Sequence, residues 1–271
     1  QRTVEISQTT VGLEVIYGDT DSIMINTRIS DINQLATIRK LGEQVKKEVN
    51  KLYKTLELEI DGIFKNMLLL KKKKYAAITV EQKKDGELVF HREEKGLDLV
   101  RRDWCVQSRD SGRFVLDQIL SSNQDKEESI SKILTHLEEV AQKMRNGELP
   151  LYKYVITRGL SKHPNDYPDG NSLPHVHVAK MMLKNNRTMT IGDHIPYIIT
   201  QPLEGEDGKA NASKSPATRA RHPDEIERSG GVLKPDVEWY LSQQILPPVS
   251  RLCEPIDGLS TGLLAERLGL D

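Results

Sequence analysis

Cysteine, aromatic residues and long apolar runs are scarce in this chain, and each scarcity excludes a class of protein. Only Cys105 and Cys253 are present among 271 residues, far apart and without CxxC spacing. This argues against a disulfide framework or a cysteine zinc site and favours a reducing compartment. No apolar run approaches the length of a membrane span. Aromatic residues make up only 5% of the chain, but 37% of its residues are hydrophobic, which is enough for a core.

An excess of charge of either sign is also absent, because 39 Lys and Arg face 40 Asp and Glu. A balanced total neither indicates nor excludes an anionic partner, so local charge has to decide. The length suits two ordinary domains or one large one. The chain begins QRTVEISQTT, without Met or a signal-peptide pattern, and we expect it to be cut from a longer polypeptide.

The apolar pattern predicts an α/β part up to about residue 94. Its expected helix has Asp31 as N-cap and apolar residues at three- and four-residue steps up to Leu52. Asp85 and Gly86 are typical of a hairpin turn. The expected strands lie at 13–17, 22–27, 56–60 and within 68–81.

The second part of the chain is predicted to be mostly helical. Pro174 suits the first position of a helix, where its missing N–H costs nothing. The Gly/Ser/Ala/Pro-rich residues 201–222 predict a mobile excursion, and Pro247 and Pro248 are expected to split a final helical pair. Helices are expected over 99–120, 126–144 and 174–185, with a short strand near 152–160.

Two carboxylates interrupt the strand-like stretch VIYGDTDSIMIN, residues 15–26. Residues i and i+2 in extended backbone project to the same side, so Asp19 and Asp21 are expected to present oxygens to one point at a hairpin tip. Mg²⁺ prefers oxygen ligands, and chemistry on a triphosphate needs a metal of this kind. A plain polar turn is the alternative, since Asp and Ser are common turn formers. The flanking apolar strands favour the metal-binding interpretation.

Four consecutive lysines, residues 71–74, precede Tyr75. Strand alternation would send half of them to each face, and a core cannot take four ammonium groups, so one face meets solvent or an anion. A solvated edge that discourages aggregation is one interpretation. A position inside a sheet favours contact with phosphate or a minor groove. For Arg101 and Arg102, an ion pair with Asp103 is as good an interpretation as a DNA contact.

Basic residues outnumber acidic ones between residues 150 and 190. Six bases face only Asp166 and Asp169 there, which gives a local charge of +4. A basic face on a balanced chain is typical of nucleic-acid binding, whereas scattered helix-surface charge explains any single base but not the group. The six bases are Lys153, Arg158, Lys162, Lys180, Lys184 and Arg187.

Three histidines lie in the same stretch. His175 and His177 stand two residues apart, with His163 upstream. A zinc site would need Cys or acidic partners at suitable spacing, and this stretch lacks them. We interpret these histidines as packing or hydrogen-bonding residues rather than ligands.

Several motifs resemble those of family B DNA polymerases. YGDTDS (17–22) is similar to the third polymerase motif, and six contiguous residues make the match specific. KKKKY (71–75) resembles the primer-contacting motif, KGLDLVRRDWC (95–105) the segment joining palm to thumb, and GDHIPYII (192–199) a thumb motif. LELEIDGIFKNMLLLKKKKYAA, YPDGNSLPHVHVAKMM and RLCEPIDG resemble the alpha group of eukaryotic members. The likeness runs from about residue 11 to 271.

The resemblance implies an α+β fold, with the C-terminal part of a palm at 1–94 (an antiparallel sheet with helices) and a mostly helical thumb at 95–271. It implies templated nucleotidyl transfer from a dNTP to a primer 3′-hydroxyl across two Mg²⁺ ions, with Asp21 as direct metal ligand and Asp19 as supporting carboxylate. From the motifs and the local charge together, the expected DNA-binding residues are Tyr17, Gly18, Thr20, Lys72, Lys73, Lys74, Tyr75, Arg101, Arg102, Arg158, Lys162 and Lys180.

The alpha group also implies partners and a place in the cell. It extends RNA and DNA primers at replication initiation and in lagging-strand synthesis. The implied partners are RNA–DNA and DNA–DNA primer–template duplexes, dNTP, primase subunits and an accessory B subunit. The implied location is the nucleus.

This chain departs from the family pattern in three ways. The first motif, whose Asp completes the metal site, the second motif, on the fingers helix, and the cysteine modules that follow the thumb are absent from it. We therefore expect a palm–thumb fragment that is inactive alone. One alternative is a non-catalytic module that grasps a duplex, which primer extension distinguishes. Another is a nucleotidyl cyclase palm, which leaves the helical half unexplained and predicts cyclic-nucleotide formation without DNA.

Overall fold

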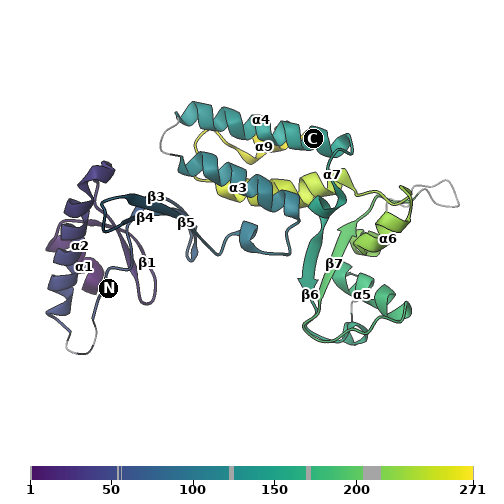
Figure 1. Cartoon of the computed structure of the whole chain (residues 1–271), viewed down its shortest axis with the longest axis horizontal. Coiled ribbons are helices and arrows are strands. Elements are labelled where there is room, and N and C mark those ends of the chain that lie inside the picture. The colour runs from purple at the N-terminus through teal and green to yellow at the C-terminus, as the bar shows by residue number, and fades with distance from the viewer. Residues whose placement is uncertain are drawn as a thin grey trace. The chain divides into compact units, whose positions relative to one another are not determined.

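The chain divides into two compact units, Gln1–Gly96 and Leu97–Asp271 (Figure 1). Antiparallel sheets and helices occur in both units, which confirms the α+β class expected from the sequence. Within the residues described, no helix is long and apolar enough to cross a membrane. The structure, a computed structural model, describes residues 2–53, 55, 57–121, 125–168, 172–203 and 215–270.

The first unit begins with a helix and a hairpin. The hairpin strands pair antiparallel close to the predicted positions, and the helix that follows buries Leu35, Val45 and Val49. Asp31 accepts a hydrogen bond from the backbone N–H of Asn33, so it caps a 3₁₀ turn rather than the α-helix itself. The helix Arg2–Thr9 was not predicted. These elements are α1 (Arg2–Thr9), β1 (Glu14–Gly18), β2 (Ile23–Asn26) and α2 (Leu35–Asn50).

A three-stranded antiparallel sheet completes the first unit. Its central strand buries Ala76, Ala77 and Val80. The predicted turn at Asp85–Gly86 is confirmed, because Gly86 has φ +90° and the Asp85 carboxylate accepts from the N–H of Glu87 at 3.0 Å. The strands, in the order in which they pair, are β3 (Phe64–Lys71), β4 (Lys74–Gln82) and β5 (Leu88–Lys95).

The strand predicted at 56–60 is wrong for the residues that the structure describes there. Leu58 lies outside any sheet, and its backbone is satisfied by a side chain instead. The amide of Asn50 accepts from the Leu58 N–H at 2.7 Å and donates to the Leu58 carbonyl at 3.1 Å. These two bonds take the place of a strand ladder, and the sheet begins only at Phe64.

The second unit is built around packed helices. The three predicted helices are present, but the first begins at Val106 and not at residue 99. The one that starts at Pro174 begins where it was expected. In Figure 1 the two longest lie side by side, with a short C-terminal helix against them. Val115, Leu116, Ile133 and Leu137 are fully buried where they pack. These helices are α3 (Val106–Leu120), α4 (Lys126–Arg145), α5 (Pro174–Lys184) and α9 (Thr261–Arg267).

A small antiparallel sheet forms the other part of this unit, and α5 packs against it. The predicted strand near 152–160 is confirmed as Ile156–Gly159. Of the stretch expected to be a mobile excursion, residues 204–214 lie outside the described residues, whereas Pro216–Arg219 forms a 3₁₀ turn. The elements of this part are β6 (Ile156–Gly159), β7 (His194–Ile199), β8 (Ala220–Arg221) and α6 (Pro223–Arg228).

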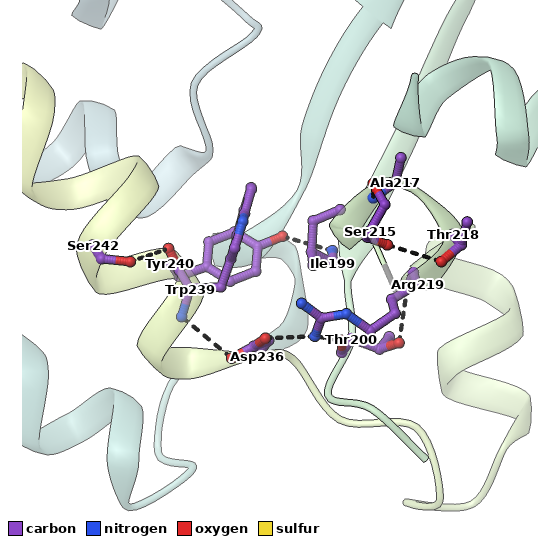
Figure 2. A network of polar contacts seen from close by, with 10 residues as sticks. All are labelled: Ile199, Thr200, Ser215, Ala217, Thr218, Arg219, Asp236, Trp239, Tyr240 and Ser242. Atoms are coloured by element: carbon purple, nitrogen blue, oxygen red, sulfur yellow. Dashed lines mark hydrogen bonds and ion pairs between the residues drawn. The ribbon is translucent and has the colours of Figure 1, made fainter. Parts of the chain in front are cut away.

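A polar network joins this sheet to the C-terminal helices (Figure 2). The buried hydroxyl of Tyr240 accepts from the Ile199 N–H at 3.1 Å and donates to the Tyr154 carbonyl at 2.7 Å. Arg219 donates to Asp236 at 2.5 Å and to the Thr200 carbonyl at 2.7 Å. The sheet and the helices are therefore held together by buried and partly buried polar contacts as well as by packing.

The proline pair does not split the C-terminal helices, so that prediction is wrong. The helix runs on through a π-helical turn, Leu241–Ile245, between α7 (Val237–Tyr240) and α8 (Leu246–Cys253). Pro248 has no N–H for the carbonyl of Gln244, four residues earlier. The hydroxyl of Ser108, on α3, donates to that carbonyl instead. A neighbouring helix thus replaces the bond that proline removes.

Candidate functional site

The acidic turn lies at the end of the β1–β2 hairpin. Strand pairing ends at Gly18 and Ile23, and the N–H of Asp19 donates to the carbonyl of Ser22 at 2.8 Å. Residues 19–22 are therefore turn rather than strand, so the expectation based on extended backbone does not apply to them. The Asp19 side chain is only 16% exposed, whereas Asp21 is exposed. The two carboxylates have different environments.

Asp19 faces a set of donors. Its Oδ1 accepts from the backbone N–H of Thr20 at 2.8 Å and from the Thr20 hydroxyl at 3.3 Å. The ammonium groups of Lys72 and Lys73 lie 3.8 and 3.7 Å from its oxygens. The hydrogen bond from the Thr20 N–H lowers the pKa of Asp19, and the two lysines add to this against the opposite effect of burial. Asp19 is therefore ionised at neutral pH.

The four lysines do not continue one strand, which corrects the alternation expected for them. Lys71 pairs with Lys74, and Lys72 and Lys73 form the two-residue turn between β3 and β4. Lys73, the second residue of this turn, has φ +62°, and a positive φ at that position alone is a feature of type II turns. The side chains of Lys72 and Lys73 are 70% and 68% exposed, and both reach Asp19. The acidic turn and the lysine turn thus lie side by side.

Tyr75 sits in the sheet beyond the lysine turn. It is 6% exposed, and its ring meets Phe64 edge-on at 6.2 Å. Its hydroxyl donates to Glu93 at 3.0 Å, and Lys95 approaches the same oxygen at 2.8 Å. Burial raises the pKa of Tyr75. Tyr75, Glu93 and Lys95 thus form a polar cluster, which the sequence analysis did not predict.

The arginines that open the second unit differ from each other. Arg101 pairs with Asp103 at 2.6 Å, which is the local ion pair expected as one interpretation. Arg102 is exposed, and its carbonyl accepts from the N–H of Thr157 at 3.0 Å. This bond ties the segment to β6, the strand that carries the exposed Arg158.

Two of the six bases counted between residues 150 and 190 have acidic partners from outside that stretch. Lys153 lies 2.5 Å from Asp110, and Arg187 lies 3.2 Å from Asp224. The local excess of positive charge is therefore smaller than the sequence count indicated. Asp169, one of the two acids in that count, lies outside the described residues.

Lys180 and Lys184, on α5, belong to a group of charges around His177. Burial lowers the pKa of His177, and Arg221, Lys184 and Lys180 lower it further. His175 is 6% exposed, and burial followed by the charge of Arg158 lowers its pKa. Both histidines therefore favour the neutral form. Arg221, which the sequence analysis did not single out, comes from β8.

Lys162 is exposed at the end of a tight loop. Its N–H and that of Ser161 donate to the hydroxyl of Tyr167 at 3.2 and 2.8 Å. The loop is thus closed by a phenol oxygen, and the lysine side chain stays on the surface. His163 has a local role, because its Nδ1 accepts from the N–H of Asn165 at 3.4 Å.

A resident metal would find only part of a ligand set here. Across the described residues, no three His, Cys, Asp or Glu side chains gather at one point. The acidic turn itself offers the carboxylate oxygens that a hard divalent cation prefers. Exposed Asp21 is open to such an ion, while Asp19 already faces two lysines.

Comparison with known proteins identifies the family. The profile of DNA polymerase family B matches residues 1–256. This chain belongs to that family. The family expected from YGDTDS and KKKKY is therefore confirmed.

Relatives of this family B chain include DNA polymerase alpha catalytic subunits, as its motifs indicated. The subunit of Xenopus laevis is 48% identical over 262 residues, which cover 96% of this chain and 17% of that protein. The subunit of Oryza sativa subsp. japonica is 48% identical over 272 residues, which cover 100% of this chain and 17% of that protein. The chain thus spans about a sixth of the length of these relatives.

A solved structure supports the same fold. The family B DNA polymerase from the hyperthermophilic archaeon Pyrobaculum calidifontis matches with a TM-score of 0.62 and 22% identity. The match covers 96% of this chain and 28% of that one. At this identity the likeness concerns the fold alone, and it agrees with the α+β architecture described above.

Proposed function

We propose that this chain is the part of a DNA-directed DNA polymerase that carries the acidic turn of the reaction centre and a primer-binding surface. The reaction is templated nucleotidyl transfer from a dNTP to a primer 3′-hydroxyl. The observation that carries the proposal is the pairing of the acidic turn with the lysine turn, with Lys72 and Lys73 3.8 and 3.7 Å from Asp19. Carboxylates on one turn can bind a metal ion, and ammonium groups on the neighbouring turn can bind a phosphate backbone, so the pair suits a site where both are present.

The two carboxylates have separate roles in this proposal. Exposed Asp21 is the residue that would hold Mg²⁺. Asp19 is the supporting carboxylate, and it lies beside the lysine turn. When bound, the ion would neutralise charge on the transferring phosphoryl group. Asp19 holds the ammonium groups beside the turn.

Magnesium is expected to bind this chain alone only weakly, because the acidic turn offers an incomplete set of ligands. Isothermal titration of the 271-residue chain with Mg²⁺ measures this. Asp21→Asn serves as the comparison, since it removes the proposed ligand and keeps the size of the side chain. Micromolar binding that survives Asp21→Asn would contradict the assignment.

The two units suit different tasks in the proposed enzyme. We infer that residues 1–94 are the C-terminal part of the palm and residues 95–271 the thumb, which grips the primer–template duplex. The proposed DNA contacts of the thumb are Arg101, Arg102, Arg158, Lys162 and Lys180, and those of the palm are Gly18, Thr20, Lys72, Lys73 and Lys74. Exposed side chains at Arg102, Arg158 and Lys162 support this assignment.

Partners follow from the alpha relatives. We infer that the complete protein works in the nucleus with primase subunits and an accessory B subunit, extending primers made of RNA and DNA. The identity of 48% with alpha catalytic subunits supports this inference. Co-purification of the full-length polypeptide with primase activity tests it, and its absence from a stable, folded preparation would overturn it.

Duplex binding is expected to depend on salt and not on sequence, because phosphate contacts release condensed counterions. The logarithm of the affinity should fall linearly with the logarithm of the salt concentration, by about 0.9 per contact. Lys180→Ala should flatten this slope by about one contact and weaken all sequences alike. Fluorescence anisotropy with two unrelated duplexes at several salt concentrations measures both effects.

The matched control is Lys132→Ala, which removes the same charge from α4, where Lys132 pairs with Glu128 at 2.7 Å. It should leave the slope unchanged. An affinity independent of salt, or a strong preference for one of the duplexes, would refute the phosphate-binding proposal.

The non-catalytic alternative is favoured by one observation, that no third ligating side chain joins the two carboxylates of the acidic turn in the part of the chain that the structure describes. It predicts that a polypeptide as long as the alpha relatives binds a primed template without extending it. Extension by that polypeptide supports the enzyme. The nucleotidyl cyclase alternative has no support from the comparisons.

A further inference from the structure

The lysine turn carries a backbone conformation that lysine does not prefer. Lys73 has φ +62°, the left-handed region in which residues other than Gly, Asn and Asp are uncommon. A glycine or asparagine would relieve the turn, but either would remove an ammonium group. Conformations of this kind persist when their surroundings hold them.

The first such restraint is a hydroxyl from another strand pair. Tyr17, on β1, accepts a hydrogen bond from the backbone N–H of Lys73 at 2.9 Å. The two residues are 56 positions apart in the chain. The bond joins the acidic hairpin directly to the tip of the next hairpin, two residues before Asp19.

The second restraint concerns the backbone carbonyl of the same residue. A Cβ atom placed on Gly96 would lie 2.4 Å from the carbonyl oxygen of Lys73, closer than any side chain can approach. Gly96 itself has φ +65°. The absence of a side chain at residue 96 therefore leaves the space that the Lys73 carbonyl occupies.

The third restraint acts on the side chain, since Asp19 lies 3.7 Å from the Lys73 ammonium group. The N–H, the carbonyl and the ammonium group of one residue are thus each met by a different segment. We propose that Tyr17 and Gly96 are positioning residues that lock the lysine turn beside the acidic turn, so that Lys73 is already oriented when a duplex arrives.

This inference rests on the proposed function for its purpose, and it assigns Tyr17 a role through Lys73 in place of a direct DNA contact. The order it creates precedes binding, so less ordering remains when the duplex binds. Neither Tyr17 nor Gly96 needs to touch the nucleic acid for its loss to weaken binding.

The experiment measures two things separately in the 271-residue chain: how firmly the Lys73 backbone is held, and how tightly the chain binds a duplex. Amide exchange of Lys73, followed by NMR, reports the hydrogen bond to Tyr17 with no ligand present. Tyr17→Phe should speed this exchange about fivefold, the factor expected for one lost hydrogen bond. Duplex anisotropy should then show weaker binding and a salt slope flatter by up to about 0.9.

Gly96→Ala tests the contact at the Lys73 carbonyl, and it does not depend on how well Tyr17→Phe folds. Its control is Gly12→Ala, because Gly12 also has a positive φ, +73°, but a Cβ there has nothing within 4 Å. The control for Tyr17→Phe is Tyr152→Phe, at a tyrosine that is 58% exposed. Only Tyr17→Phe and Gly96→Ala should alter Lys73 exchange and duplex binding. In a Lys73→Ala background neither should weaken binding further.

Two results overturn the proposal. One is unchanged Lys73 exchange in both Tyr17→Phe and Gly96→Ala. The other is faster exchange with wild-type duplex affinity and slope, which would show that the lock does not serve binding. If the wild-type chain itself binds no duplex, the proposed DNA-binding role of this chain fails, and the exchange measurement still decides whether the lock exists.

Discussion

Asp21→Asn is expected to lower nucleotide incorporation by roughly a thousandfold in a polypeptide as long as the alpha relatives. The amide keeps the size of the side chain and removes the charge that would hold a metal ion. Asp21 is exposed at the tip of its turn, so the fold should tolerate the change. Single-turnover extension of a primed template measures the effect, and circular dichroism checks that the protein remains folded.

Two further variants make this result specific. Asp19→Asn should cause a smaller loss, or one that depends on the metal supplied, because Asp19 faces Lys72 and Lys73. Asp85→Asn, in the turn between β4 and β5, is the matched control at a second hairpin tip. An Asp21→Asn enzyme within tenfold of wild type would exclude Asp21 as the metal ligand.

Asp236→Ala is expected to lower the free energy of unfolding of the second unit by about 3 kcal/mol. Asp236 pairs with Arg219 at 2.5 Å, and their side chains are only 18% and 14% exposed. Removing the carboxylate leaves the guanidinium without its counter-charge at a poorly solvated position. It also removes the cap that accepts from the Trp239 N–H at 3.2 Å (Figure 2).

Urea denaturation followed by the fluorescence of Trp104 and Trp239, both in the second unit, measures this change. Asp257→Ala is the control, because the Asp257 side chain is 99% exposed and lies 3.6 Å from Lys126. That change should stay within about 0.5 kcal/mol. A loss below about 1 kcal/mol for Asp236→Ala would show that water compensates Arg219.

Much of the fold was predictable because it is encoded locally. The apolar steps of α2 and α4, the turn residues Asp85 and Gly86, and Pro174 at the start of α5 each depend on neighbours in the chain. The family was likewise readable from two short motifs. These features need no knowledge of distant contacts.

The errors share a different physical cause, since each depends on a contact that no local sequence pattern marks. Four identical lysines contain no residue that marks a turn, and the turn at Lys72–Lys73 is set by the pairing of β3 with β4. Leu58 leaves the strand pattern because Asn50 satisfies its backbone. At the site, no pattern in KGLDL indicates that Gly96 makes room for a carbonyl 23 residues earlier.

The hydroxyl of Ser108 that meets the Gln244 carbonyl also bears on the order in which the second unit folds. The α-helical bond to that carbonyl from four residues later is missing, because Pro248 has no N–H to offer. Ser108, which donates to it, lies on α3, 136 positions earlier in the chain. We therefore expect the hydrogen bonding of the C-terminal helix to be completed only when α3 docks. We expect these two parts of the unit to gain and lose their structure together, as one cooperative block rather than as separate helices.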